Sequence, residues 1–243
     1  MTNGGNPASR RVLDWTGIDL SALWLTLKVA GWATLIALLL GVACGRALAR
    51  ACWPGRRWLA AVLTLPMVLP PTVLGYYLIV LLGRNSAFGG WLDARFGITL
   101  LFTWQGAVVA AAAVAFPFVF VSARAAFEGV DTTLEKAARV LGAGELKVFA
   151  WVSLPLATRG IAAGTMLAFA RAMGEFGATL MIAGNIPGKT QTLSLAVHDA
   201  VQSGNDALAN ALVIVISVVC MALLVAASHL LDARAAGSAA RTA

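Results

Sequence analysis

Five long apolar stretches alternate with short polar segments along the chain. They cover residues 22–45, 58–82, 100–122, 156–183 and 207–231. The hydrocarbon core of a bilayer is about 30 Å thick, and an α-helix needs about 20 apolar residues to cross it. Each stretch meets that length. The pattern therefore predicts five transmembrane helices and leaves little chain for a soluble domain.

Composition agrees with this pattern. The 243 residues are 60% hydrophobic and 12% charged, and the mean hydropathy is +0.83. These values are typical of an all-α integral membrane protein rather than a soluble domain. We expect three parts: a periplasmic tail over 1–19, a transmembrane domain over 20–231 and a cytoplasmic tail over 232–243.

The loop charges predict an orientation. In the tails, in the loops and at the span ends, eleven basic residues are assigned to one face and five to the other. By the positive-inside rule this places the N-terminus outside and the C-terminus in the cytoplasm. The larger set is Arg46, Arg50, Arg56, Arg57, Arg124, Lys136, Arg139, Lys147, Arg159, Arg234 and Arg241, and the smaller is Arg10, Arg11, Arg84, Arg95 and Lys189. The net charge of +7 thus reflects membrane orientation, and we expect no nucleic-acid partner.

The second stretch carries prolines at membrane depth. Pro66, Pro70 and Pro71 remove backbone donors, so they predict a kink or an unwound stretch. Irregular backbone within a bilayer persists only where it is buried in protein or lines a wet cavity. The prolines therefore serve either helix packing or a pathway. The pathway interpretation adds the residues that follow them: Thr72, Gly75 and Tyr76.

The segment 131–155, between the third and fourth stretches, predicts two short helices. Thr132-x-x-Glu135 fits a capping box, and Gly142 and Gly144 would end the first helix. The apolar positions of that helix lie on one face: Leu134, Ala137, Ala138 and Leu141. A second helix follows over 145–152, after which Ser153 would cap the fourth span and Pro155 would begin it. An apolar face exposed in this way indicates a partner groove.

The fourth stretch holds two opposite charges. Arg171 and Glu175 are four residues apart, so we expect them on one helix face and within reach of each other. A lone charge at the bilayer centre costs about 2.5–3.5 kcal/mol on insertion scales, which argues against a lipid-facing position. Either the pair neutralises itself at a helix contact, or its face borders a gated pathway. The second hypothesis adds Gly174, Gly177 and Thr179.

Other chemical patterns are weak. Residues 183–190 fit a relaxed phosphate-loop pattern, but they follow a predicted membrane helix and lack the strand and the α/β domain of a nucleotide site. His198 and His229 lack metal-site spacing, and no nucleophile–base pair indicates an enzyme. The three cysteines suggest packing or free thiols. Whether 191–202 forms a sixth short helix stays open.

A family resemblance appears at this point. The stretch "KAARVLGAGELKVFAWVSLP" resembles the cytoplasmic EAA loop of ABC-importer permeases. Two positions depart from that pattern: Lys136 stands at the nominal Glu position, one residue after Glu135, and Val152 replaces Ile. Three further stretches, "LPMVLPPTVLGYYLIVLLG", "FARAMGEFGAT" and "AGNIPGKTQTLSLAV", are similar to permease subunits of molybdate importers, the ModB type.

The resemblance implies a type I ABC-importer permease fold and a homodimer in the bacterial inner membrane. It also implies two cytoplasmic ATPase subunits, which use ATP and Mg²⁺, and a periplasmic molybdate-binding protein; this chain itself would bind no cofactor and no metal. The resemblance assigns ATPase coupling to Glu135, Ala137, Ala138, Gly142, Leu154 and Pro155. The family's alternating access would move molybdate, with sulfate, thiosulfate or tungstate as alternatives. A rival hypothesis is a secondary transporter that works without ATP.

Overall fold

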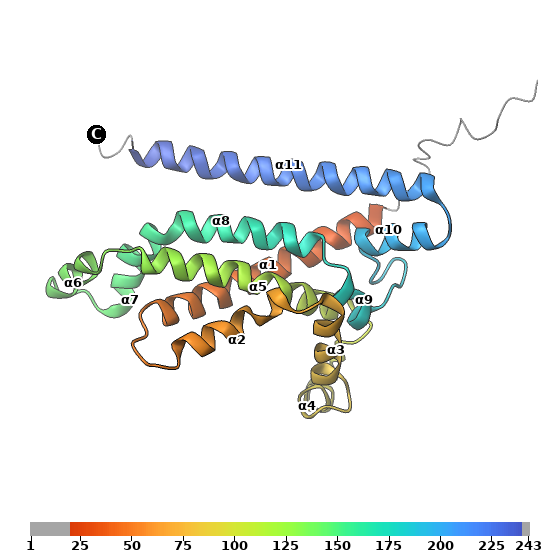
Figure 1. Ribbon diagram of the computed structural model, residues 1–243, viewed down its shortest axis with the longest axis horizontal. Helices are drawn as coiled ribbons and strands as arrows, with labels where there is room; N and C mark the ends of the chain where they lie inside the picture. Colours follow the sequence, from red (N-terminus) through yellow and green to blue (C-terminus); the bar gives the residue numbers. More distant parts are fainter. Residues whose placement is uncertain (1–19, 240–243) are drawn as a thin grey trace, which may run out of the picture.

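The computed structural model describes the backbone of residues 20–239 and the side chains of 21–226 and 228. The predicted tail at 1–19 lies outside the described residues, and so do the last residues, 240–243, of the predicted tail over 232–243. Residues 232–239 of that predicted tail are a continuation of the last helix instead. Helices account for all the regular structure in the described part (Figure 1). They are α1 (Leu20–Ala49), α2 (Arg56–Val68), α3 (Pro71–Leu82), α4 (Ala87–Phe96), α5 (Trp104–Glu128), α6 (Thr132–Val140), α7 (Glu145–Val148), the π-helical turn η3 (Phe149–Ser153), α8 (Leu154–Met173), α9 (Gly177–Ala183), α10 (Leu193–Gln202) and α11 (Asp206–Ala239).

The core is a contact of small residues between α1, α5 and α8. Fully buried alanines of α1, among them Ala33 and Ala37, pack with Ala111 and Ala115 of α5. A Cβ at Gly41 would stand 2.8 Å from the Cβ of Val119, so only glycine allows the approach there. Membrane helices associate through such small residues because burial from lipid supplies no hydrophobic driving force.

The second span is broken. Leu69 and Pro70 form the turn between α2 and α3, and the two helices are bent by 112°. Figure 1 shows α3 and α4 leaving the bundle as an arm, roughly across the direction of α1, α5 and α8. Within the described residues, four helices are long and apolar enough to cross a membrane, and the bent pair makes a fifth if it counts as one span. The predicted break at the prolines is thus a sharp turn.

The fourth span ends earlier than the apolar pattern predicts. The expected range was 156–183, but α8 ends at Met173 and a separate helix, α9, begins at Gly177. Hydropathy could not mark this end because apolar residues continue on both sides of it. The region 191–202 does hold a short helix, α10, which packs with α11.

Candidate functional site

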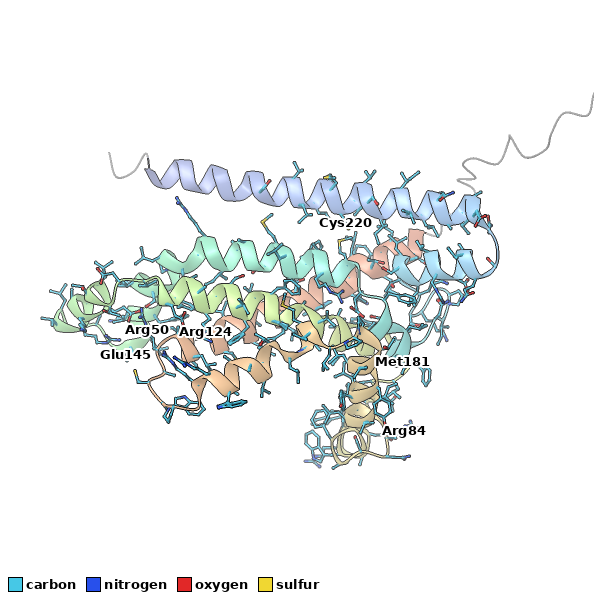
Figure 2. The ribbon with its side chains drawn as sticks, in the orientation of Figure 1. Arg50, Arg84, Arg124, Glu145, Met181 and Cys220 are labelled. Carbon is cyan, nitrogen blue, oxygen red and sulfur yellow. The ribbon has the colours of Figure 1, made fainter. Side chains whose placement is uncertain are left out.

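One end of the bundle gathers the segment 131–155, which we call the coupling segment, with the C-terminal turns of α1. Figure 2 places Arg50, Arg124 and Glu145 together at this end. Helix α6 begins at Thr132, as expected, but its cap is Asp131, whose carboxylate accepts the amide of Thr133 at 2.8 Å. The expected capping box is therefore wrong, and Glu135 is free for another role.

Glu135 joins three parts of the chain. It is 2% exposed, and its Oε1 accepts hydrogen bonds from Arg50 Nη2 at 2.9 Å and Ser153 Oγ at 2.6 Å. Arg46 Nη1 adds an ion pair at 3.1 Å. Arg46 lies in the last turn of α1, Arg50 follows directly after α1, and Ser153 belongs to η3. One carboxylate therefore holds α6 against the end of α1 and the start of α8.

The ionisation of Glu135 follows from these contacts. Burial by itself would raise the pKa of the carboxyl, since a charge is costly away from water. The hydrogen bonds from Ser153 and Arg50, together with the positive charges of Arg46 and Arg50, outweigh it and lower the pKa below its ordinary value. Glu135 is therefore ionised at neutral pH, and the contact is a salt bridge.

The opposite side of the coupling segment is apolar and exposed. Val140 and Leu141 are 87% and 88% exposed, and Leu146 and Trp151 are similarly open. Gly142 follows the end of α6 with φ +84. Its amide donates a hydrogen bond to Arg139 O, and the amide of Ala143 donates one to Ala138 O. This is a Schellman motif, which needs a left-handed residue and so favours glycine. The predicted stop at Gly142 is confirmed with its physical reason.

The coupling segment continues into α8 without a break. Helix α7 passes through the π-helical turn η3 into α8, and Ser153 caps nothing because it lies inside this continuous helix. The prediction that Ser153 caps the fourth span is therefore wrong. The Ser153 hydroxyl donates a hydrogen bond to Glu135 instead. Helix α6 is therefore connected to the start of α8 through the Glu135–Ser153 hydrogen bond as well as through the chain.

A second cluster lies where α3 meets α9 (Figure 2, near Met181). A Cβ at Gly75 would stand 2.8 Å from Met181 Cβ, and a Cβ at Gly177 would stand 2.9 Å from Pro71 Cβ. The fold therefore brings together two sequence motifs that are about a hundred residues apart. The close approach depends on glycine on both helices.

Arg171 and Glu175 form the ion pair that their spacing predicts, at 2.8 Å between Nη2 and Oε2. Glu175 lies beyond the end of α8, so the pair bridges a helix end rather than sharing one helix. Glu175 Oε1 also accepts a hydrogen bond, at 2.8 Å, from the amide of Ala178 in the first turn of α9. Glu175 is 3% exposed, whereas the Arg171 side chain is 29% exposed and borders a cavity of about 120 Å³ together with Pro66 and Pro71.

The predicted site residues thus fall into two groups, one in the coupling segment and one around the broken span. In the coupling segment, Ala137 and Pro155 are exposed, and Ala138 and Leu154 are half-buried. Around the broken span, Pro70, Thr72 and Tyr76 are exposed, whereas Thr179 is buried. At Gly174, an added Cβ would meet only Ala170 O, at 3.9 Å. The sequence interpretation missed the partners of Glu135: Arg46 and Arg50 served there only to set orientation.

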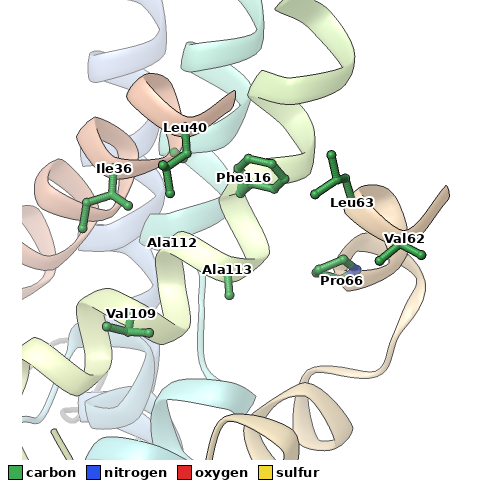
Figure 3. A pocket seen from close by; sticks show the side chains of 10 residues that line it. Ile36, Leu40, Val62, Leu63, Pro66, Val109, Ala112, Ala113 and Phe116 are labelled. Atoms are coloured by element: carbon green, nitrogen blue, oxygen red, sulfur yellow. The ribbon is translucent and has the colours of Figure 1, made fainter. Parts of the chain in front are cut away.

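The recess against the broken span has no polar lining for an ion. This recess of about 350 Å³ between α1, α2 and α5 is lined only by apolar side chains, including Leu40, Pro66 and Phe116 (Figure 3). Within the described residues, no group of histidine, cysteine and acidic side chains could hold a metal. Residues 184–192 form a loop between α9 and α10, outside any α/β domain.

Comparison with known proteins decides the family. The model of the family described as "Binding-protein-dependent transport system inner membrane component" matches residues 26–236. The chain belongs to this family. The molybdenum transport system permease protein ModB of Escherichia coli strain K12 is 45% identical over 86% of the chain and 93% of the relative's length. The putative molybdenum transport system permease protein YvgM of Bacillus subtilis strain 168 is 44% identical over 82% and 88%.

Solved structures agree on the fold of this permease. An inward-facing MetNI methionine ABC transporter aligns with a TM-score of 0.69 and 18% identity, over 88% of this chain and 94% of that one. The likeness confirms the expected type I ABC-importer fold. The chain is a multi-pass inner-membrane permease subunit rather than an enzyme, and ATP hydrolysis belongs to a separate subunit.

Proposed function

We propose that this permease forms the membrane channel of an ATP-driven molybdate importer. Its 45% identity, over most of both chains, to a molybdenum permease carries the choice of substrate. On the predicted orientation the coupling segment faces the cytoplasm, and a periplasmic molybdate-binding protein delivers the anion to the α9–α10 end. This chain binds no cofactor; ATP and Mg²⁺ are used by two partner ATPases.

The coupling segment is the proposed ATPase docking site. Its exposed apolar residues, Val140, Leu141 and Leu146, fit a groove on a partner, since such a face is unfavourable in water. Ala137 and Ala138 allow the partner to approach the helix closely. When ATP closes the ATPase dimer, α6 moves, and the Glu135 contacts and η3 pass this movement into α1 and α8.

The proposed pathway lies where α8 ends and α9 meets the broken span. Moving α8 displaces Arg171 and the Glu175 cap of α9, so the Gly75–Gly177 contact opens or closes. Arg171 offers the one positive charge that borders the cavity in the described residues, and Glu175 prevents it from holding an anion too tightly. A permeation path needs weak binding so that the anion leaves again.

The proposed homodimer uses the α3–α4 arm. The arm projects from the bundle (Figure 1). Its side chains Tyr76, Val80 and Trp91 are exposed. A group of large exposed apolar side chains marks a contact with lipid or with protein, and in this proposal a second copy of the chain covers them. Tyr76 would then lie near the shared pathway.

The experiment that tests the proposal is uptake into proteoliposomes that contain this chain and the ATPase, supplied with the binding protein. We expect molybdate uptake that requires ATP, with tungstate and sulfate as competitors to define selectivity. Uptake of sulfate but not molybdate would overturn the substrate. Uptake without ATPase would overturn the importer and favour the secondary transporter.

A pair of variants tests the docking site. Val140→Asp and Leu141→Asp put charge on the exposed face, so ATPase should no longer co-purify and uptake should be lost. Thr133→Asp is the matched control, because it adds the same charge at an exposed position in the first turn of α6. Equal ATPase capture by all three variants would contradict this docking face.

A further inference from the structure

Two neighbouring recesses follow one face of α1 near the α9–α10 end. The first, about 470 Å³, lies between α1, the start of α5 and the loop after α9, and is lined by Lys28, Lys189 and Gln105 among others. The second, about 490 Å³, follows α1 past Gly31 to Leu35. Trp24 and Lys28 line both recesses, so the two adjoin.

The first recess is positively charged. Lys28 lies over the ring of Trp104, 3.7 Å from its centroid, which holds the ammonium group in place. Lys189 is exposed on the facing loop. Among the described residues, no acidic side chain lines this recess. Its chemistry therefore suits an anionic group such as a phosphate.

The second recess is apolar and open. Trp24, Lys28, Gly31 and Leu35 follow one another at helical spacing, so they share one face of α1. A Cβ at Gly31 would meet nothing within 4 Å, which makes this position a notch in the face. Tryptophan and lysine are typical of the membrane–water interface, and apolar residues continue below them toward the bilayer core.

We infer that an anionic phospholipid binds this composite recess. Its phosphate lies between Lys28 and Lys189, and one acyl chain follows the notch at Gly31 toward Leu35. The order of polar and apolar lining matches a lipid that stands upright in the bilayer. A protein segment would match the charge but not the apolar groove that continues along a membrane helix.

The test is native mass spectrometry of the purified full-length chain, mixed with phosphatidylglycerol or with phosphatidylcholine of the same acyl chains. We expect preferential retention of phosphatidylglycerol. Lys28→Gln/Lys189→Gln should weaken it by about fivefold for each lysine removed, the usual effect of one basic residue near an anionic membrane. Arg84→Gln/Arg95→Gln is the matched control, because it removes two charges from the α3–α4 region outside the recess.

A second variant separates lipid binding from folding. Gly31→Leu fills the notch and keeps both lysines, so retention of either lipid should fall while the melting temperature is unchanged. Equal lipid retention by the lysine variant and the control would overturn the inference. So would displacement of the lipid by inorganic phosphate alone, which would indicate a free-anion site, or a photo-crosslink from position 31 to a protein chain.

Discussion

Two buried carboxylates in this permease are held in opposite ways. Glu135 has a hydroxyl donor from η3, two arginines from the end of α1 and the residue after it, and a more distant arginine from its own helix: Ser153, Arg46, Arg50 and Arg139. Glu175 has one cation, Arg171, and one backbone amide, both close to it along the chain. The first carboxylate would keep most of its partners if one were lost, and the second would not.

The difference indicates different duties. A carboxylate with several partners from distant elements makes a joint that moves as one body, which suits transmission of force. A carboxylate with a single counter-charge at a helix end can change partner at small cost, which suits a gate. Four predictions test this comparison, from the largest expected effect to the smallest.

Removing the charge at the joint should have the largest effect. Glu135→Gln leaves Arg46 and Arg50 facing each other without a carboxylate, and breaking such a buried pair costs about 3–4 kcal/mol. Unfolding in mixed micelles measures this loss. Glu145→Gln is the control, because Glu145 is exposed and pairs with Arg139 at the surface. Similar losses for the two variants would contradict the joint.

The two residues of the Arg171–Glu175 pair should differ in how much stability their removal costs. Arg171→Gln leaves a buried carboxylate unpaired and should cost about 2–3 kcal/mol, whereas Glu175→Gln leaves a partly exposed arginine and should cost about 1 kcal/mol. The double variant should recover most of the stability, since it leaves no lone charge. The same unfolding assay, run on all three variants, gives the coupling. Additive losses would show that the two residues act independently.

The close approach of α3 and α9 gives a smaller effect. Gly75→Ala and Gly177→Ala each force a Cβ to within 3 Å of a neighbour, so we expect a loss of about 1–2 kcal/mol and slower uptake. Gly174→Ala is the control, because its Cβ meets nothing closer than 3.9 Å. If Gly174→Ala slowed uptake as much as the other two, bending at position 174 rather than helix contact would control the gate.

The smallest effect is that of pH on the joint. The pKa of Glu135 is lower in the folded chain than its ordinary value of 4.5, so the ionised carboxylate stabilises the fold above that pH. This contribution is lost as the pH falls through the lower pKa of the folded state. The melting temperature of the native chain should therefore drop more steeply below pH 4.5 than that of Glu135→Gln. Parallel curves would mean that Glu135 does not titrate with unfolding.

Sequence reasoning located the spans and the coupling segment because both depend on local patterns. Bilayer thickness sets the length of an apolar run, and the stop at Gly142 is predicted from the helical pattern that precedes it. The Arg171–Glu175 contact was also local. In contrast, Glu135 bonds Arg50 across 85 residues, and no periodicity along the chain indicates which arginine is the partner.

The end of α8 shows a second reason for error. Hydropathy is continuous from Met173 through α9, so composition carried no boundary there. Gly174 and Gly177 look equivalent in the sequence, yet an added Cβ crowds Pro71 at one and has room at the other. Only the packing of a distant helix distinguishes them.

The uncovered apolar face of α6 and α7 also matters for the amount of protein in the cell. A permease made in excess of its ATPase keeps Val140, Leu141 and Leu146 in contact with water. Exposed apolar side chains of this kind attract chaperones and proteases, which remove chains that stay unassembled. The proposed docking surface would thereby also tie the abundance of the permease to the supply of its ATPase.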